Sequence, residues 1–274
     1  MPTTPLRVPI VMAAALLTLP CLSSGPRAED AVWPDIHKSV FDGRAIAEND
    51  GAVALYAPEQ AEDAAIVPVA VHIPASVANS AKALTLIIDR NPAPVAATFR
   101  FGTGFQARPE IGERKLTTRI RVDSFSHVRA VLETADGKLH MATAFVRGAG
   151  GCSAPASKDA DEALANLGKM QVKTIANPTL GQSWREAVIM IRHPNFTGMQ
   201  MDLISRGYTP ARFVNDLSVT RGADLVLTME GGISISEDPN IRFNYDARDE
   251  DGLHVRAVDT DGAEFSARSQ PTGS

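Results

Sequence analysis

A two-residue alternation of apolar and polar side chains is the dominant pattern of the chain between residues 66 and 146. In one segment the alternating apolar residues are Val67, Val69, Val71 and Ile73. The same spacing recurs in the segments 84–88, 116–122 and 139–145. Successive side chains of a strand point to opposite faces of a sheet, so this pattern predicts short β-strands. Turn signals such as Asp136-Gly137 separate the strands.

The alternation returns in the last third of the chain, in the segments 184–193, 223–229, 232–236, 240–247 and 252–260. Several short strands with turns between them are typical of a β-sandwich. We therefore predict an all-β protein with two sandwich domains, at residues 33–147 and 180–268. Residues 269–274 are predicted to form a disordered tail.

The segment between the two predicted domains, residues 148–179, breaks the alternation. Its apolar residues follow helical spacing over residues 159–171, and Asp159 with Glu162 can form a capping box. These features predict a partly helical linker that ends near Pro178–Gly181, and a further helical turn is predicted near His37–Phe41. A structureless connection of about thirty residues is uncommon, so the linker is expected to be functional or partly ordered.

The N-terminus has the features of a secretory signal peptide. Arg7 supplies a positive charge, and residues 8–19 form an apolar run that is too short to span a bilayer. Small residues offer cleavage sites after Gly25 or after Ala28, between which the sequence does not decide. We predict a signal peptide at residues 1–28 and a periplasmic mature protein; an uncleaved anchor is the alternative.

Removal of the signal peptide also removes Cys21 and leaves a single cysteine, Cys152. A lone cysteine in an exported protein implies either intermolecular pairing or a reactive thiol. Cys152 lies in the stretch RGAGGCSAP, where Gly148, Gly150 and Gly151 precede it. We predict that these glycines form a flexible arm and that Cys152 is a covalent attachment point. The alternative is a plain glycine-rich linker with an incidental cysteine.

Other classes of function find little support in the sequence. The formal net charge of -5 argues against a nucleic-acid partner. The six histidines lack the spacing of a metal site, and four of them are predicted to face solvent from strands: His72, His127, His140 and His254. A mobile thiol lacks the orientation that a catalytic nucleophile needs. The sequence therefore predicts no metal, no cofactor and no enzymatic activity.

Several motifs resemble a known family of bacterial sulfur oxidation. The segments 87–92 (IIDRNP) and 116–122 (LTTRIRV), with Gly150-Gly151-Cys152, resemble the carrier subunit SoxY. The segments 192–199 (RHPNFTGM), 209–214 (TPARFV) and 232–241 (GISISEDPNI) resemble its partner SoxZ. The match covers about residues 35–150 and 180–268. The whole chain is similar to the SoxYZ-like fused carriers that are associated with quinoprotein dehydrogenases.

The resemblance implies immunoglobulin-like domains packed side by side within one monomer, and a Cys152 that carries a sulfur intermediate. It implies partners among periplasmic redox enzymes, either of sulfur oxidation or of a quinoprotein dehydrogenase and cytochrome c system that uses pyrroloquinoline quinone. Ser153 and Ala154 replace the glycines that follow the cysteine in SoxY, and the chain continues instead of ending there. The alternative function is a binding or assembly factor for a quinoprotein dehydrogenase, in which Cys152 is incidental.

Overall fold

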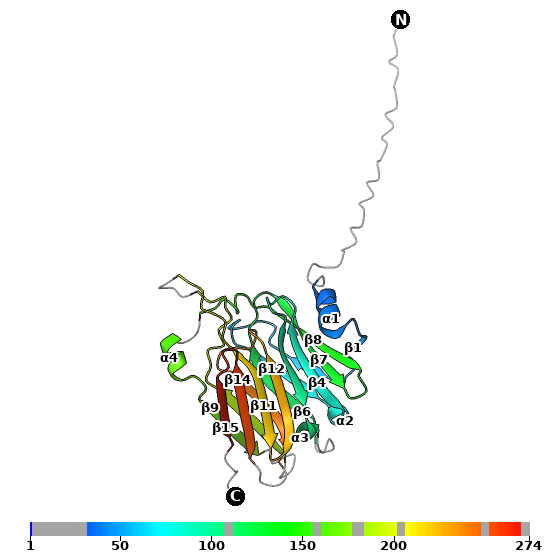
Figure 1. The fold of residues 1–274 in the computed structure, drawn as a ribbon. Helices are drawn as coiled ribbons and strands as arrows, with labels where there is room; N and C mark the ends of the chain where they lie inside the picture. Colours follow the sequence, from blue (N-terminus) through cyan, green and yellow to red (C-terminus); the bar gives the residue numbers. More distant parts are fainter. Residues whose placement is uncertain are drawn as a thin grey trace.

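The computed structural model describes residues 1, 32–106, 112–155, 160–176, 184–201, 206–247 and 252–269. Nearly all of the predicted signal peptide and the predicted boundary at Pro178–Gly181 lie outside these residues. The described chain is dominated by β-strands, which confirms the predicted all-β class (Figure 1). The strands form two sheets.

Among the described residues, the first half of the chain holds eight strands and three short helices. Its elements are α1 (Trp33–Phe41), β1 (Ile46–Glu48), β2 (Ala54–Tyr56), β3 (Val67–Ile73), α2 (Ala75–Ala78), β4 (Ala81–Ile88), β5 (Val95–Phe101), α3 (Thr103–Gln106), β6 (Arg114–Ile120), β7 (Ser126–Thr134) and β8 (Leu139–Val146). The predicted turn at His37–Phe41 is the last part of α1, which begins four residues earlier with Pro34 in its first turn. Proline fits there because the first N–H groups of a helix have no intrahelical partner.

The second half holds one helix and seven strands. Its elements are α4 (Ala160–Ala165), β9 (Met170–Ala176), β10 (Trp184–Ile191), β11 (Val214–Arg221), β12 (Asp224–Gly231), β13 (Asn240–Asp246), β14 (Leu253–Asp259) and β15 (Glu264–Arg268). Among the described residues no helix is long and apolar enough to cross a membrane.

The two halves share both sheets. The nine-stranded sheet has the order β1-β8-β7-β4-β5-β12-β11-β14-β15, and the six-stranded sheet has the order β2-β3-β6-β13-β10-β9. Antiparallel pairing of β5 with β12 joins the halves in one sheet, and pairing of β6 with β13 joins them in the other. The predicted pair of sandwiches is therefore one continuous sandwich, because the edge strands of the two halves hydrogen-bond to each other instead of only packing side by side.

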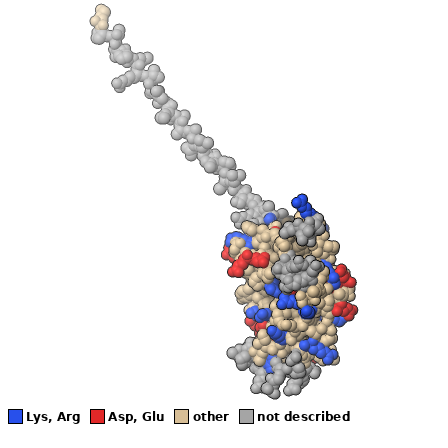
Figure 2. All heavy atoms as spheres, turned by 90° about the vertical axis from the view of Figure 1, so that its left-hand side faces the viewer, with Lys and Arg blue, Asp and Glu red and all other residues tan. Residues whose placement is uncertain are grey.

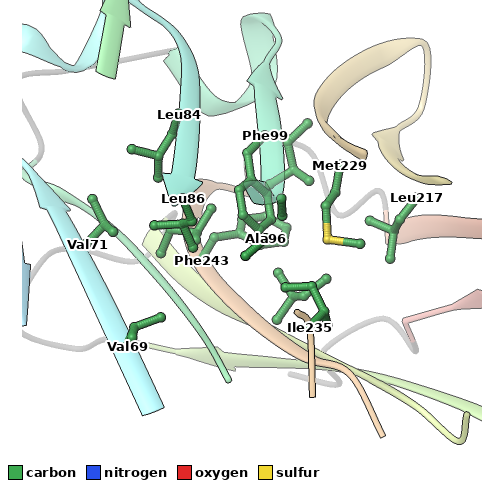
Figure 3. Close-up of a cluster of buried hydrophobic side chains, with 14 of the residues drawn as sticks. Val69, Val71, Leu84, Leu86, Ala96, Phe99, Leu217, Met229, Ile235 and Phe243 are labelled. Atoms are coloured by element: carbon green, nitrogen blue, oxygen red, sulfur yellow. The ribbon is translucent and has the colours of Figure 1, made fainter. Parts of the chain in front are cut away.

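One hydrophobic core fills the space between the sheets across the junction of the halves (Figure 3). Val71 and Leu86 come from the first half, and Met229 and Phe243 come from the second. Phe99 on β5 lies opposite Met229 on β12 in the register, and both side chains are fully buried. Burial of side chains of this size contributes about 1.5–3 kcal/mol each, so the junction stabilises both halves.

The predicted linker contains regular structure that belongs to the second half. The predicted helix at 159–171 is shorter in the structure, where α4 ends at Ala165, and Asp159 lies outside the described residues. Residues 170–176 form β9, which pairs antiparallel with β10 along its whole length. The second half therefore begins before residue 180. The predicted tail also begins too early, because Ser269 is buried and its hydroxyl accepts a hydrogen bond from the backbone N–H of Leu253 (2.8 Å).

The shared sheets predict that the halves unfold together. The chain offers one tryptophan in each half, Trp33 on α1 and Trp184 on β10. In Trp33→Phe, fluorescence reports on the second half, and in Trp184→Phe it reports on the first. We expect the fluorescence midpoint in urea to coincide with the far-ultraviolet circular dichroism midpoint within each variant. Two separated midpoints in either variant would show that the halves unfold independently.

Candidate functional site

Cys152 lies in a short segment that turns back from the end of β8 and packs on the chain just after β6. The backbone N–H of Gly150 donates to the carbonyl of Asp123 (2.9 Å), and that of Gly151 donates to the carbonyl of Val122 (3.1 Å). The side chain of Cys152 is fully buried. Cys152 is a free cysteine, so its sulfur is a thiol. Because the side chain is buried, solvent does not reach this thiol in the packed arrangement.

The glycines of this segment permit close packing. A Cβ atom on Gly151 would lie 2.1 Å from the carbonyl oxygen of Ala64 and 2.7 Å from that of Val122, which no side chain could tolerate. Gly150 has a φ of +75°, a left-handed conformation that favours glycine. Gly148 is buried as well. The predicted flexible arm of Gly148, Gly150 and Gly151 is thus a packed turn in this structure, because the glycines allow the backbone to approach its neighbours.

Both halves of the chain hold the backbone of Cys152. Its N–H donates to Oδ1 of Asp123 from the first half (3.2 Å), and its carbonyl accepts a hydrogen bond from Oγ1 of Thr197 in the second (2.6 Å). The buried guanidinium of Arg121 donates to the carbonyl of Gly151 (3.1 Å) and lies 3.5 Å from the carbonyl of Asn195. The cysteine segment therefore fills the junction between the halves.

Gln200 fixes Thr197, because its Oε1 accepts a hydrogen bond from the N–H of Thr197 (2.8 Å) and lies 3.0 Å from Oγ1 of Thr197. A buried polar network around Asn195 holds the preceding part of the same loop. The amide of Asn195 accepts a hydrogen bond from the N–H of Val214 (3.1 Å) and donates to the carbonyl of Ser236 (3.1 Å). Asn195 has a φ of 43°, which asparagine tolerates better than most residues. Asn195 therefore fixes the loop that contains Thr197 to the backbone at Val214 and Ser236.

His193 completes the network beneath this loop. Its Nδ1 accepts a hydrogen bond from the N–H of Asn195 (3.0 Å), and its Nε2 faces Oδ2 of Asp259 (3.4 Å). Burial lowers the pKa of His193, and the neighbouring Asp259 carboxylate only partly offsets this effect. A neutral imidazole that donates from Nε2 satisfies both contacts, so His193 has a structural role in holding the backbone of Asn195.

The surroundings of the thiol favour its protonated form. Burial first, and then the Asp123 carboxylate, raise the pKa of Cys152 to about 12, although Arg121 opposes the shift. Burial also lowers the pKa of Arg121. The thiolate is the nucleophilic form of cysteine, so Cys152 is unreactive at neutral pH while the segment stays packed.

The histidines are less exposed than predicted. His72, His127, His140 and His254 are each half-buried. Nδ1 of His72 lies 3.2 Å from Oε1 of Glu113, and Nδ1 of His140 lies 2.6 Å from Oδ2 of Asp50. Within the described ranges no three His, Cys, Asp or Glu side chains are grouped so as to hold a metal ion.

Two protein-family models match the two halves of the chain. The family model of the sulfur oxidation protein SoxY matches residues 37–152, and that of the sulphur oxidation protein SoxZ matches residues 173–270. The SoxY match thus ends on Cys152, and the SoxZ match includes Thr197. The chain is a fused SoxYZ-like protein. The hydrogen bond between Thr197 and Cys152 therefore links the SoxY-like half to the SoxZ-like half.

Solved structures add two distant likenesses. The sulfur carrier protein SoxY from Chlorobium limicola f thiosulfatophilum is 24% identical, with a TM-score of 0.35, over 44% of this chain and 94% of that chain. A β-glycosidase from Bacteroides vulgatus is 9% identical, with a TM-score of 0.24, over 80% of this chain and 25% of that chain. No curated protein matches the chain.

Sequence reasoning found Cys152 and its glycines but did not find the residues that hold them. Arg121 lies at the end of a predicted strand and Asp123 comes directly after it, where alternation alone gives them no special role. Thr197 stood in the motif RHPNFTGM, so the resemblance to SoxZ marked the segment without showing what it contacts.

The Thr197 hydroxyl is expected to hold the cysteine segment closed. Thr197→Val keeps the shape of the side chain but removes the donor to the Cys152 carbonyl, which favours local opening. A lost hydrogen bond of this kind corresponds to about a tenfold change in an opening equilibrium. We expect Cys152 of the folded protein to react about tenfold faster with a chromogenic disulfide at pH 7. Thr197→Ser, which keeps the hydroxyl, should react nearly as wild type; equal rates in all three proteins would contradict this role.

The raised pKa of Cys152 predicts a pH dependence of stability. Because the folded-state pKa lies above the ordinary value of 9.0, the thiol contributes its full stability below pH 9 and loses it as pH rises towards 12. Between pH 8 and pH 10, wild type should lose about 1 kcal/mol more free energy of unfolding than Cys152→Ser, which carries no ionisable group there. Parallel pH profiles of the two proteins in urea unfolding would refute the buried thiol.

Proposed function

We propose that this protein is a periplasmic, non-enzymatic carrier that holds a sulfur intermediate on Cys152 and presents it to partner enzymes. The observation that carries the proposal is the position of Cys152, which ends the SoxY match and is held by Thr197 of the SoxZ-like half. A SoxY domain followed by a SoxZ domain supports a sulfur carrier role. A carrier leaves the chemistry to its partners, so it needs no base or cofactor of its own.

The transfer needs only a thiolate and a persulfide donor. The Cys152 thiolate attacks the outer sulfur of a donor R–S–SH, the donor's S–S bond breaks, and R–S⁻ leaves. Cys152 then carries the persulfide, and the reaction consumes no outside oxidant. Delivery is the same exchange in reverse, with the partner's thiolate as the nucleophile.

The packed thiol cannot take part in this exchange, so the carrier cycle requires the segment around Cys152 to open. Opening breaks the contacts from Asp123, Thr197 and Arg121 and returns the thiol to water, where its pKa falls towards the ordinary value. The chain between Val146 and Ala160 is tethered at both ends. An out-and-back loop of this length reaches about 20 Å at most, which is enough to enter a shallow partner site.

The proposed partners are periplasmic redox enzymes, either of the sulfur-oxidation type or of a quinoprotein dehydrogenase and cytochrome c system. The second candidate function, a binding or assembly factor for a quinoprotein dehydrogenase, is favoured by one observation. Cys152 is buried with a pKa near 12, as a structural cysteine would be. The two functions differ in whether Cys152 is required.

The decisive experiment is an intact-mass measurement of the protein purified from the periplasm of its own host, with and without reductant. The carrier proposal expects a reductant-labile adduct of one or more sulfur atoms that maps to Cys152 and is absent from Cys152→Ser. A bare thiol under all growth conditions, together with a Cys152→Ser variant that still co-purifies with its partner and supports activity, would favour the assembly factor and overturn the carrier.

A further inference from the structure

A charged cavity lies between the two halves, on the outer side of the six-stranded sheet. Its volume is about 450 Å³, within the range of small-molecule sites. Ile66 and Arg119 line it from the first half. The remaining lining residues come from the second half, on the segments 166–171, 190–192 and 237–240.

The cavity combines an apolar lining with basic groups. Ile66, Met170, Met190 and Ile191 supply the apolar surface. The cations are Arg119, Lys169 and Arg192, and they outnumber the two lining carboxylates, Glu237 and Asp238. Methionine side chains adapt readily to the shape of a small apolar group. The side of the molecule that carries β9 and β15 shows Lys and Arg across its middle and Asp and Glu towards its margins (Figure 2). This side is locally positive although the chain carries a net charge of -5.

The three cations differ in how their charge is compensated. Arg192 is neutralised by Asp238, whose Oδ2 lies 2.5 Å from Nη1 of Arg192. Lys169 donates to the neutral side-chain oxygen of Asn166 (2.7 Å), and Arg119 donates to the backbone carbonyl of Asp238 (2.7 Å). Within the part of the chain that the structure describes, neither Lys169 nor Arg119 forms an ion pair with a carboxylate.

Arg119 also has an unused donor. Its Nε–H is buried and has no hydrogen-bond partner among the described residues. Arg119 as a whole is only half-buried, so an anion in the cavity can pair with the exposed part of its guanidinium and offset part of the cost of the unsatisfied donor through its charge. Arg119 and Lys169, the two cations without carboxylate partners, line the same cavity as Met170 and Met190.

We propose that this cavity binds a small organic anion, such as a sulfonate or carboxylate with a short apolar chain. Arg119 and Lys169 hold the anionic group, and Met170 and Met190 contact the chain. Arg192 and Asp238 neutralise each other and form one wall. Arg121, two residues after Arg119, donates to the Gly151 carbonyl, and Glu237 of the cavity lining acts on Arg121 electrostatically.

The test uses 1-hexanesulfonate as the probe and isothermal titration calorimetry of the reduced full-length protein at low salt. No sulfur donor is present, so the outcome is independent of the carrier function. We expect saturable one-to-one binding, and weaker binding of methanesulfonate, which lacks the chain. Hexylammonium, which has the chain but the wrong charge, should not bind. Absence of saturable hexanesulfonate binding, or equal binding of hexylammonium, would overturn the proposal.

Matched variants locate the site. Lys169→Met should weaken hexanesulfonate binding about tenfold, because it removes one charged donor. Lys173→Met removes the same charge from β9 outside the cavity and should bind as wild type. Arg119→Met should weaken binding at least as much, with its melting midpoint recorded to show that it is folded. If Arg119→Met fails to fold, the comparison of Lys169→Met with Lys173→Met decides, and equal binding by those two variants would refute the site.

Discussion

The pairing of β5 with β12 is the contact on which the rest of the structure depends. It runs over five residue pairs from Ala97 to Phe101 and makes one sheet from the two halves of the chain. The second link, β6 with β13, is shorter, with two paired residues in the other sheet. Because both sheets are continuous, the SoxZ-like half has a fixed position relative to the SoxY-like half, and Thr197 meets the carbonyl of Cys152 at hydrogen-bond distance. A flexible connection between two separate domains could not hold such a contact.

The same fixed junction explains why a glycine-rich segment is packed. Gly151 approaches the carbonyls of Ala64 and Val122 closely, and the N–H groups of Gly150 and Gly151 find partners there. The segment is nevertheless held by a small number of hydrogen bonds and by one small buried side chain, Cys152. Each such bond contributes about 1 kcal/mol net, so the closed arrangement is stable but can open without disturbing the core. Such local opening is what the proposed carrier function would require of the cysteine segment.

Much of the fold could be predicted from the sequence, because the alternation in β3, β4, β6 and β8 is a local property. The predicted strand at 232–236 is instead a turn with one isolated bridge at Ile235. Several strands, such as β5, β7 and β15, lie outside the predicted segments. Two further missed strands, β9 and β11, have clear physical reasons. In β11 a register shift between Val214 and Asp216 breaks the alternation. The strand β9 begins only five residues after α4 ends, so its alternation follows directly on a helical pattern. The predicted linker therefore included β9. The shared sheets could not be predicted, since residues such as Phe99 and Met229 are 130 positions apart and either strand could have been a free edge.

For the candidate site, too, only part could be predicted from the sequence. Cys152 could be found because a single thiol is unusual in a chain that is predicted to be exported, and the resemblance to SoxY supported it. Its environment could not be found, since a glycine run is compatible both with mobility and with close approach, and only the neighbouring carbonyls distinguish the two. The packed arrangement gives Arg121 a role that a mobile arm would not, because its guanidinium holds the Gly151 carbonyl. Arg119, two residues earlier near the end of β6, lines the charged cavity. Glu237, which lines the same cavity, acts electrostatically on Arg121, so the charges of the cavity and of the cysteine segment are coupled through this stretch of the SoxY-like half.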